Sequence, residues 1–332
     1  MPASRNSTEG AGGNLPAAVC PVLVGVTAVG KTSLIVGLAQ RFPIEVISLD
    51  SRQVYRGMCI GTSQPTGAEQ ASCPHHLVNF VDPSLKYTAG KYRLDFTRAY
   101  HDIHRRGRIP VVVGGAGLYL RTLQEGLLEL PGVTVGDTAR VRAELQRLSE
   151  KEIRARLHVL DRPSWDAIHP HDRYRNQRAV EICILAGRPM STLREEQQPQ
   201  PALGLNYQVL LLQRPAAIIA RRIATRTAAM LASGWIEETE SLLAQYRPEA
   251  PGLQAIGYRQ IVAWLGGELP YTELEAKIVV ATRQYAKRQR TWFRHIPTLA
   301  TGEPEDGAIL RKIEALLARA QTGRADGDPQ LA

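Results

Sequence analysis

One stretch of the chain has the residue types and the spacing of a phosphate-binding loop. Residues 25–32, GVTAVGKT, match the pattern G-x-x-x-x-G-K-[ST] in full. The glycines allow backbone N–H groups to curve around a phosphate, and the following helix adds the positive end of its dipole. Lys31 supplies a mobile cation, and the Thr32 hydroxyl can join the coordination shell of a Mg²⁺ ion. A phosphate or diphosphate ligand is therefore expected at Gly25, Val26, Thr27, Ala28, Val29, Gly30, Lys31 and Thr32.

A carboxylate, Asp50, directly follows the apolar run Ile44–Leu49. Ligands of open α/β sheets gather at the carboxyl ends of the strands, so we expect Asp50 to face the phosphate loop. A carboxylate in that position could hold Mg²⁺ through water or take a proton from a nucleophile. The structural alternative is a solvated helix N-cap, for which Asp is equally well suited.

Two weaker signals fall at the same predicted edge of the sheet. Residues 114–117, GGAG, follow the apolar run Ile109–Val113, and such glycines permit a close approach to a ligand or serve a plain turn. Arg222 and Arg226 lie four apart on a predicted helix and therefore share a face. Nucleotide kinases close such arginines over phosphates, and a structural pair is the alternative.

Strands and helices alternate along most of the chain. The sequence predicts strands at Pro21–Val24, Ile44–Leu49, Ile109–Val113 and Tyr207–Leu212, and helices at Lys31–Arg41, from Leu118, at Ala216–Tyr246 and at Thr272–Phe293. This order predicts an α/β fold, a parallel sheet with helices on both faces.

The stretch 131–200 has helix patterns, two or three of them, and no strand, which indicates an all-helical insertion. We expect residues 19–130 and 201–320 to form the P-loop catalytic domain around it. Residues 1–18 and 321–332 have the composition of disordered tails.

Composition excludes several classes of protein. The chain has 332 residues, 44% hydrophobic and 22% charged, which is ordinary globular composition. No stretch approaches the roughly 18 apolar residues of a membrane span, and the N-terminus lacks the pattern of a signal peptide. The widely spaced Cys20, Cys59, Cys73 and Cys183 fit reduced thiols in a cytoplasm. A cytoplasmic monomer with no membrane partner is expected.

Basic residues are concentrated in two places. With 41 Lys and Arg against 32 Asp and Glu the net charge is +9, and residues 140–178 and 276–302 are rich in Arg with aromatic residues interleaved. Cations contact phosphates, and arginine or aromatic planes stack on unpaired bases. Solvated helix faces are the alternative for each cluster, but two clusters beside a phosphate loop favour a nucleic-acid substrate. The histidine pairs 75–76 and 169/171 lack supporting ligands, so ordinary polar contacts are expected there.

These motifs, taken in order, resemble the tRNA dimethylallyltransferase (isopentenyltransferase) family. The resemblance rests on the loop at 25–32, DSRQVY at 50–55, VGGAGLY at 113–119, IHPHD at 168–172, IGYR at 256–259 and TRQYAKRQRTW at 282–292. It spans roughly residues 20–297. The second and last motifs are far more specific than the phosphate loop.

The resemblance implies a P-loop-kinase-like α/β domain with a helical insertion that grips the tRNA anticodon stem-loop. It implies transfer of the prenyl group of dimethylallyl diphosphate to N6 of adenosine 37 in tRNA. Asp50 then matches the family's general base and Arg226 its diphosphate-binding arginine, with Arg222 in support. Lys31, Thr32 and Mg²⁺ would neutralise the departing diphosphate.

The resemblance also implies tRNA contacts, and two residues depart from the family pattern. Val26 stands where Pro is usual, and Ala116 where Thr is usual, so a hydroxyl contact to RNA is missing there. The expected tRNA-binding residues are Asp50, Ser51, Arg52, Gln53, Ala116, Arg142, Tyr174, Arg175, Asn176, Gln177, Arg178, Gln254, Ala255, Ile256, Gly257, Tyr258, Arg259, Arg283, Lys287 and Arg288.

Three other functions share part of this pattern. A small-molecule or nucleoside kinase using ATP would need the loop, Asp50 and the arginine pair, but gives the C-terminal basic segment no task. A prenyltransferase acting on a free nucleotide would not need the basic insertion. A non-catalytic RNA-binding NTPase relative is the third alternative, and the absence of an N-K-x-D-like guanine-reading motif counts against a GTPase.

Overall fold

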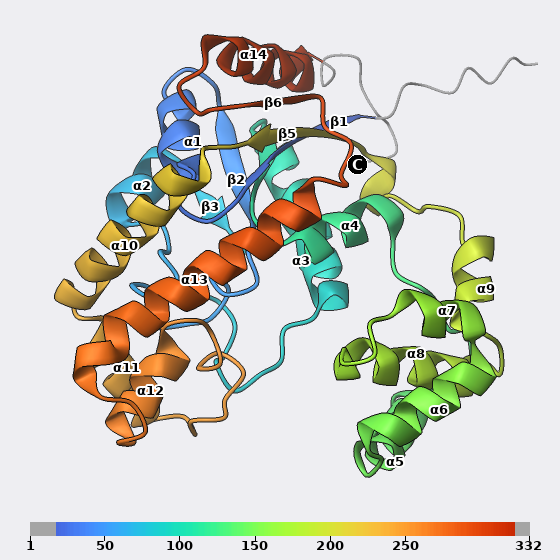
Figure 1. Cartoon of the computed structure of the whole chain (residues 1–332). Helices are drawn as coiled ribbons and strands as arrows, with labels where there is room; N and C mark the ends of the chain where they lie inside the picture. Colours follow the sequence, from blue (N-terminus) through green and yellow to red (C-terminus); the bar gives the residue numbers. More distant parts are fainter. Residues whose placement is uncertain (1–17, 323–332) are drawn as a thin grey trace, which may run out of the picture. The chain divides into compact units, whose positions relative to one another are not determined.

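The computed structural model describes residues 18–322 (Figure 1). It divides into two compact units, one of residues up to Gln124 and from Pro201 onward, the other Glu125–Gln200. The second unit thus starts before residue 131, where the insertion was expected to begin. The expected tails lie outside the described residues except at their inner ends, where Gln321 and Thr322 prove to be the last residues of a helix.

A parallel sheet forms the centre of the larger unit. It has six strands in the order β3-β2-β4-β1-β5-β6, and every neighbouring pair is parallel. The four predicted strands are confirmed, whereas β3 and β6 are too short to leave an apolar pattern. The strands are β1 Val19–Gly25, β2 Ile44–Leu49, β3 His75–His76, β4 Ile109–Gly114, β5 Asn206–Leu212 and β6 Ala300–Gly302.

Helices cover both faces of this sheet, as predicted. Alternate strand residues point to opposite faces, so Leu23 packs with α1, α10 and α14 while Val22 and Val24 pack with α3 and α4. Each such buried side chain contributes about 1.5–3 kcal/mol. The helices of this unit are α1 Lys31–Ala39, α2 Gly67–Ser72, α3 Ala89–Arg105, α4 Gly117–Glu125, the 3₁₀ turn Ala202–Gly204, α10 Ala216–Ala232, α11 Trp235–Leu243, α12 Tyr258–Leu265, α13 Tyr271–Phe293 and α14 Gly307–Thr322.

The predicted helix 216–246 is wrong in one respect, because the structure breaks it into α10 and α11. Gly234 between them has φ +95°, a left-handed conformation that glycine adopts without strain. The break turns α11 so that its Trp235 and Leu242 pack with α12, the first turns of α13 and residues 54–58. This third apolar cluster supports the loops that follow β2.

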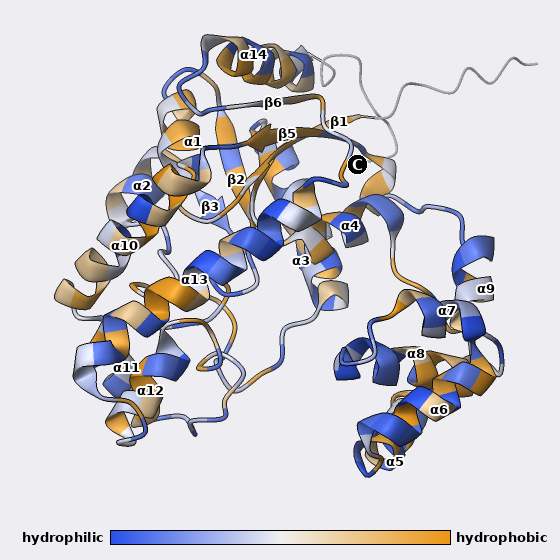
Figure 2. Cartoon of the chain, viewed as in Figure 1, coloured by the Kyte–Doolittle hydropathy of each residue, from blue (hydrophilic) through white to orange (hydrophobic). Residues whose placement is uncertain are grey.

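The longest helix, α13, changes character along its length. Figure 2 shows a hydrophobic stretch of this helix followed by a hydrophilic one, in agreement with IVVA at 278–281 followed by TRQYAKRQR at 282–290. Within residues 18–322 no helix is both long enough and apolar enough to cross a membrane.

The smaller unit is a helical bundle with its own apolar core. It contains five helices where two or three were expected, because short turns separate them. Two of its helices begin with capping boxes, Thr134 with Asp137 and Ser149 with Glu152, which satisfy the first N–H groups of each helix. The helices are α5 Val135–Gln146, α6 Glu150–Leu160, α7 Arg162–Ala167, α8 Arg173–Ala186 and α9 Met190–Glu196.

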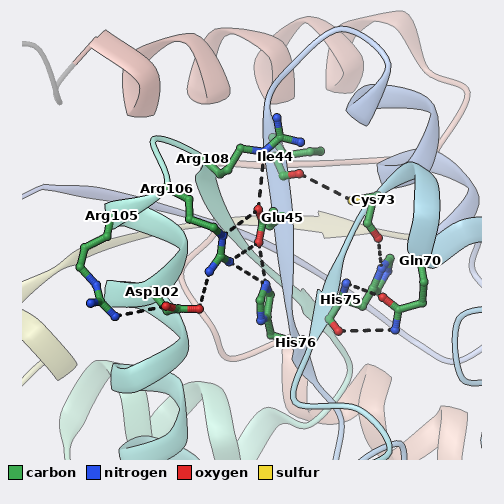
Figure 3. Close-up of polar contacts among 10 residues, drawn as sticks. All are labelled: Ile44, Glu45, Gln70, Cys73, His75, His76, Asp102, Arg105, Arg106 and Arg108. Carbon is green, nitrogen blue, oxygen red and sulfur yellow. Dashed lines mark hydrogen bonds and ion pairs between the residues drawn. The ribbon is translucent and has the colours of Figure 1, made fainter.

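A buried carboxylate, Glu45, fastens the start of β2 to its neighbours (Figure 3). It is 5% exposed and accepts hydrogen bonds from Arg106 Nη2 at 2.6 Å and from the His76 ring at 2.7 Å, with Arg108 at 3.5 Å. Burial opposes its charge, but the hydrogen bonds from Arg106 and His76 outweigh burial and hold the pKa of Glu45 below its ordinary value. His75, which precedes His76 in β3, donates Nδ1–H to the Cys73 carbonyl, so both histidines make ordinary polar contacts.

We expect Glu45→Gln to lower the free energy of unfolding near pH 7 by about 1–3 kcal/mol. This is less than for a fully buried pair, because Arg106 still reaches water. The folded-state pKa of Glu45 is lowered, so the pair stabilises the fold above the ordinary value of 4.5 and loses this effect as the pH falls through the lower value. Urea unfolding across this range measures the difference between variant and wild type. Glu314→Gln, in the exposed pair with Arg41, is the control and should change little; a Glu45→Gln effect as small as that of the control would contradict the prediction.

Candidate active site

The phosphate loop connects the end of β1 to the start of α1. Gly25 is required there, because a Cβ would lie 2.7 Å from the Leu212 carbonyl oxygen. Gly30 has φ +111° and Ala28 φ +64°, so the loop turns through left-handed conformations before the helix begins. Lys31 Nζ donates to the carbonyl oxygens of Gly25 and Val26 at 2.9 and 3.1 Å. The loop therefore has the backbone curvature and the cation that a phosphate site needs.

Three arginines from the β5–α10 region hold the loop from outside. Arg214 Nε donates to the Val29 carbonyl at 2.9 Å, Arg222 Nε to the Ala28 carbonyl at 2.7 Å, and Arg226 Nη2 to Thr27 Oγ1 at 2.7 Å. Arg222 and Arg226 share a face of α10, as their spacing predicted. Arg214 was not predicted as a site residue from the sequence. It lies before the predicted helix and belongs to none of the motifs.

Asp50 is placed at the carboxyl end of β2, where it was expected. Its Oδ1 accepts from the backbone N–H groups of Arg52 and Gln53 at 2.7 and 3.2 Å, so it does cap the turn that follows. No group in the described part of the chain hydrogen bonds to Oδ2. One oxygen thus orients the carboxylate, and the other is available to a ligand.

A single glutamine, Gln289 of α13, connects the phosphate loop to the glycine-rich turn at residues 114–117, which follows β4. Its Oε1 accepts from the Thr27 N–H at 2.8 Å and its Nε2 donates to the Gly115 carbonyl at 3.0 Å. A Cβ on Gly115 would lie 2.2 Å from Nε2, and one on Gly117 2.1 Å from the ring of Trp292. Gly115 and Gly117 therefore make room for side chains of α13, and Gly114 and Gly115 also line the cavity described next.

These groups surround one cavity of about 710 Å³. Its wall combines the loop residues Thr27, Lys31 and Thr32 with Asp50, Gln53, Arg222 and Arg226. Cys59, Ile60, residues 62–67 and Glu69 line another side, and Tyr285 and Gln289 bring α13 to the wall. The volume is in the range of small-molecule sites.

The charges in the cavity influence one another. Burial, with a smaller contribution from the nearby Arg226, lowers the pKa of Lys31 to about 8, although the Asp50 carboxylate opposes this shift. Burial also lowers the pKa of Arg226, again with Asp50 opposing. Asp50 is therefore the charge that partly compensates both cations, and an anionic ligand would relieve the rest.

The donor set suits a hard cation that arrives with a phosphate ligand. The Thr32 hydroxyl and the Asp50 carboxylate both line the cavity and offer oxygen, which Mg²⁺ prefers together with substrate phosphates. Within residues 18–322 no group of three or more His, Cys, Asp or Glu side chains is placed to hold a metal ion.

The expected tRNA-binding residues of the larger unit fall in several places. Asp50 and Gln53 line the cavity, Ser51 and Arg52 follow on the same turn, and Ala116 precedes α4. Arg288 lies beside the Tyr285 ring, 5.9 Å from its centre. Arg283 and Lys287 instead line a separate hollow of about 500 Å³ between α10 and α13.

Part of the segment 254–259 is buried. Tyr258 is 0% and Ala255 3% exposed, and Gly257 is also enclosed, so these side chains do not reach the surface. Ile256 is half-buried, whereas Gln254 and Arg259 are exposed. An RNA contact from this segment therefore depends on Gln254 and Arg259.

Most of the expected residues of the smaller unit contact other residues of that unit. The buried Glu181 pairs with both Arg142 and Arg178. Asn176 is 2% exposed, so it supports the segment before α8 by donating to the His169 carbonyl at 3.0 Å. Tyr174 is 72% exposed. Arg175 pairs with Asp172, and Gln177 is half-buried.

A parallel sheet with a phosphate-loop motif at its carboxyl edge, and a carboxylate across the same cavity, places the chain among the P-loop-like α/β enzymes. The profile of the family described as IPP transferase matches residues 53–296, and that of isopentenyl transferase matches residues 19–76. The chain belongs to this tRNA dimethylallyltransferase family and is a prenyltransferase.

Known relatives match over most of their length. The tRNA dimethylallyltransferase of Bordetella parapertussis is 41% identical over 299 residues, which cover 89% of this chain and 96% of the relative. That of a Synechococcus species is 43% identical over 278 residues, 83% of this chain and 79% of the relative.

Solved structures are similar in fold. A eukaryotic dimethylallyltransferase acting on tRNA is 32% identical with a TM-score of 0.74, covering 83% of this chain and 70% of that chain. The tRNA isopentenylpyrophosphate transferase of Bacillus halodurans is 30% identical with a TM-score of 0.66, covering 93% and 100%.

We expect the affinity for inorganic pyrophosphate to fall as the pH rises through about 8. Lys31 loses its charge there, and a bound anion raises its pKa, so binding above that pH takes up a proton. Calorimetric titrations in buffers of different ionisation enthalpy measure both effects. In Lys31→Arg the cation persists and only the ligand's own ionisation remains, so its affinity should depend less on pH; equal pH dependence in the two proteins would refute the role of Lys31.

We expect Gln289→Ala to weaken pyrophosphate binding roughly tenfold or more, because the Thr27 N–H and the Gly115 carbonyl lose their partner. Each unpaired buried group costs about 1–3 kcal/mol, and 1.4 kcal/mol is tenfold in affinity. Calorimetry and urea unfolding measure the losses of binding and stability. Gln284→Ala, an exposed amide on the same helix, is the control, and matching results for the two variants would contradict the bridging role.

Proposed function

We propose that the protein transfers the dimethylallyl group of dimethylallyl diphosphate to N6 of adenosine 37, 3′ of the anticodon in tRNA. The products are N6-dimethylallyladenosine and diphosphate. The observation that carries this proposal is the single cavity that holds both the phosphate loop and the unoccupied Oδ2 of Asp50. The loop suits the diphosphate, and the carboxylate suits the nucleophile.

The adenine amine is a poor nucleophile, because its lone pair is delocalised into the ring. Asp50 accepts a proton from N6 as N6 bonds to the allylic carbon, and the carbon–oxygen bond to the diphosphate breaks. The turn of Arg52 and Gln53 orients Asp50 through Oδ1, which leaves Oδ2 for this proton.

The departing diphosphate gains charge as the bond breaks. The N–H groups of the phosphate loop, Lys31 and Arg226 stabilise this charge, with Arg222 holding the loop in shape. When Mg²⁺ is bound, the Thr32 hydroxyl would hold it, and the ion would neutralise part of the negative charge of the diphosphate. Arg226 contacts Thr27 Oγ1 in this structure, so it is already at the loop.

A nucleic-acid acceptor accounts for the basic surfaces. Only a base turned out of its stack can enter an enclosed cavity, and in an unpaired anticodon loop this costs about a few kcal/mol or less. Arg52, Arg259 and Arg288 are exposed cations of the larger unit, and the cations of the smaller unit, such as Arg142, suit the phosphates of the stem. The relatives named for tRNA support this acceptor over the small acceptor of a kinase.

We expect Asp50→Asn to retain pyrophosphate affinity within about threefold but to lower prenyl transfer by about 100-fold or more, because the general base is lost. The assay contains Mg²⁺, radiolabelled dimethylallyl diphosphate and unmodified tRNA with adenosine at position 37.

Two controls separate the alternatives. Free AMP should remain unlabelled, and tRNA with guanosine at position 37 should also remain unlabelled. Phosphate transfer from ATP to a small acceptor, with no label in tRNA, would replace the proposal by the kinase.

A further inference from the structure

A loop after β2 forms one wall of the cavity without belonging to a helix or strand. Of residues 59–64, all but Gly61 line the cavity. Ser63 has φ +51°, a conformation that is uncommon outside glycine. Such a wall keeps its shape only if other groups hold it in place.

Glu238 of α11 holds this loop by its backbone. Its Oε2 accepts from the N–H groups of Cys59 and Ile60, both at 2.8 Å, and its Oε1 from the Gly61 N–H at 3.2 Å. One carboxylate therefore receives three consecutive N–H groups of the loop. Hydrogen bonds to a charged acceptor are stronger than those between neutral groups.

Two aromatic residues fix Glu238 against the loop. The Tyr258 hydroxyl donates to Glu238 Oε1 and also lies 3.1 Å from the Gly61 nitrogen. The Trp235 ring fills the space beside Gly61, where a Cβ would lie 1.9 Å from Nε1. Tyr258 and Trp235 are 0% and 2% exposed and meet edge to face. The carboxylate is thus built into the apolar cluster of α11 and α12.

On the cavity side the loop is fastened to the turn of Asp50. Gln53 Nε2 donates to the carbonyl oxygens of Thr62 and Ser63 at 3.3 and 2.8 Å, and the Gln53 N–H donates to Asp50 Oδ1. Gln53 Oε1 accepts from the Ser48 hydroxyl at 3.0 Å. The loop therefore stands between Glu238 and the residue that orients Asp50.

We propose that Glu238 is a positioning residue of the transferase, acting through the 59–64 loop and Gln53 on the Asp50 carboxylate. This inference rests on the proposed function. The loop carbonyls fix the Gln53 amide, the Gln53 N–H fixes Asp50, and Glu238 fixes the loop. A small misplacement of a catalytic group costs rate even when the fold is intact.

Glu238→Gln tests this, because it preserves size but replaces one acceptor oxygen by an NH₂ that repels N–H donors. With tRNA and dimethylallyl diphosphate both saturating, we expect kcat to fall about 10- to 100-fold. The assay temperature is kept well below the unfolding transition of every variant, so lost stability alone does not change kcat. Glu240→Gln, exposed on the same helix, is the matched control and should retain full kcat. Glu238→Asp restores the charge and should recover part of the loss.

A double-mutant cycle with Gln53→Ala tests the route. If Glu238 acts through Gln53, adding Glu238→Gln to Gln53→Ala lowers kcat little further. If the two substitutions acted independently, their fold losses of kcat would multiply. That outcome, or an unchanged kcat in Glu238→Gln, would show that Glu238 does not act through Gln53.

Amide hydrogen exchange keeps this test separate from the proposed function. Glu238→Gln should speed exchange at Cys59, Ile60 and Gly61, whereas Glu240→Gln should not. Unchanged hydrogen exchange at these three residues would show that Glu238 does not hold the loop, even if the wild type is active. Absence of prenyl transfer in the wild type defeats the proposed function and with it the catalytic role of Glu238, whatever the exchange shows.

Discussion

The side-chain amide of Gln289 joins two loops that come from different strands. One is the phosphate loop after β1, the other the glycine-rich turn after β4, and the amide pairs with one backbone group of each. Because Gln289 lies on α13, the same contact fixes the helix that carries Tyr285 to the wall of the cavity. If this contact were lost, the loop, the turn and the helix would each be free to shift.

Charge imposes the second constraint on the site. Lys31 and Arg226 lie close enough to Asp50 for its carboxylate to raise the pKa of both, against burial, which lowers them. The protein therefore maintains more positive than negative charge in a partly enclosed space. A bound diphosphate would offset this excess of positive charge. The arrangement of charges that is unfavourable in the free protein therefore favours the ligand.

Sequence patterns predicted the features that depend on residues close together in the chain. The phosphate loop, the four longer strands, α13 and the place of Asp50 follow from local periodicity and spacing. Contacts between residues distant in the chain were not predicted, because no local pattern connects Gln289 to Thr27 or Glu238 to Cys59.

Several differences have a simple physical origin. Gly115 and Gly117 also make room for the side chains of Gln289 and Trp292, and no local pattern reveals these distant neighbours. The helix break at Gly234 depends on packing of Trp235, and the two shortest strands exist only because β2 and β5 provide edges to pair with.

The order of the strands also determines how the chain is completed during synthesis. β1 pairs with β5, whose first residue Asn206 lies beside Val19, and the whole unit Glu125–Gln200 is made between them. A contiguous segment with its own core can fold as soon as it leaves the ribosome, whereas long-range pairings wait for both partners. The phosphate loop precedes this unit in the chain, and it is therefore completed only after α13 has followed.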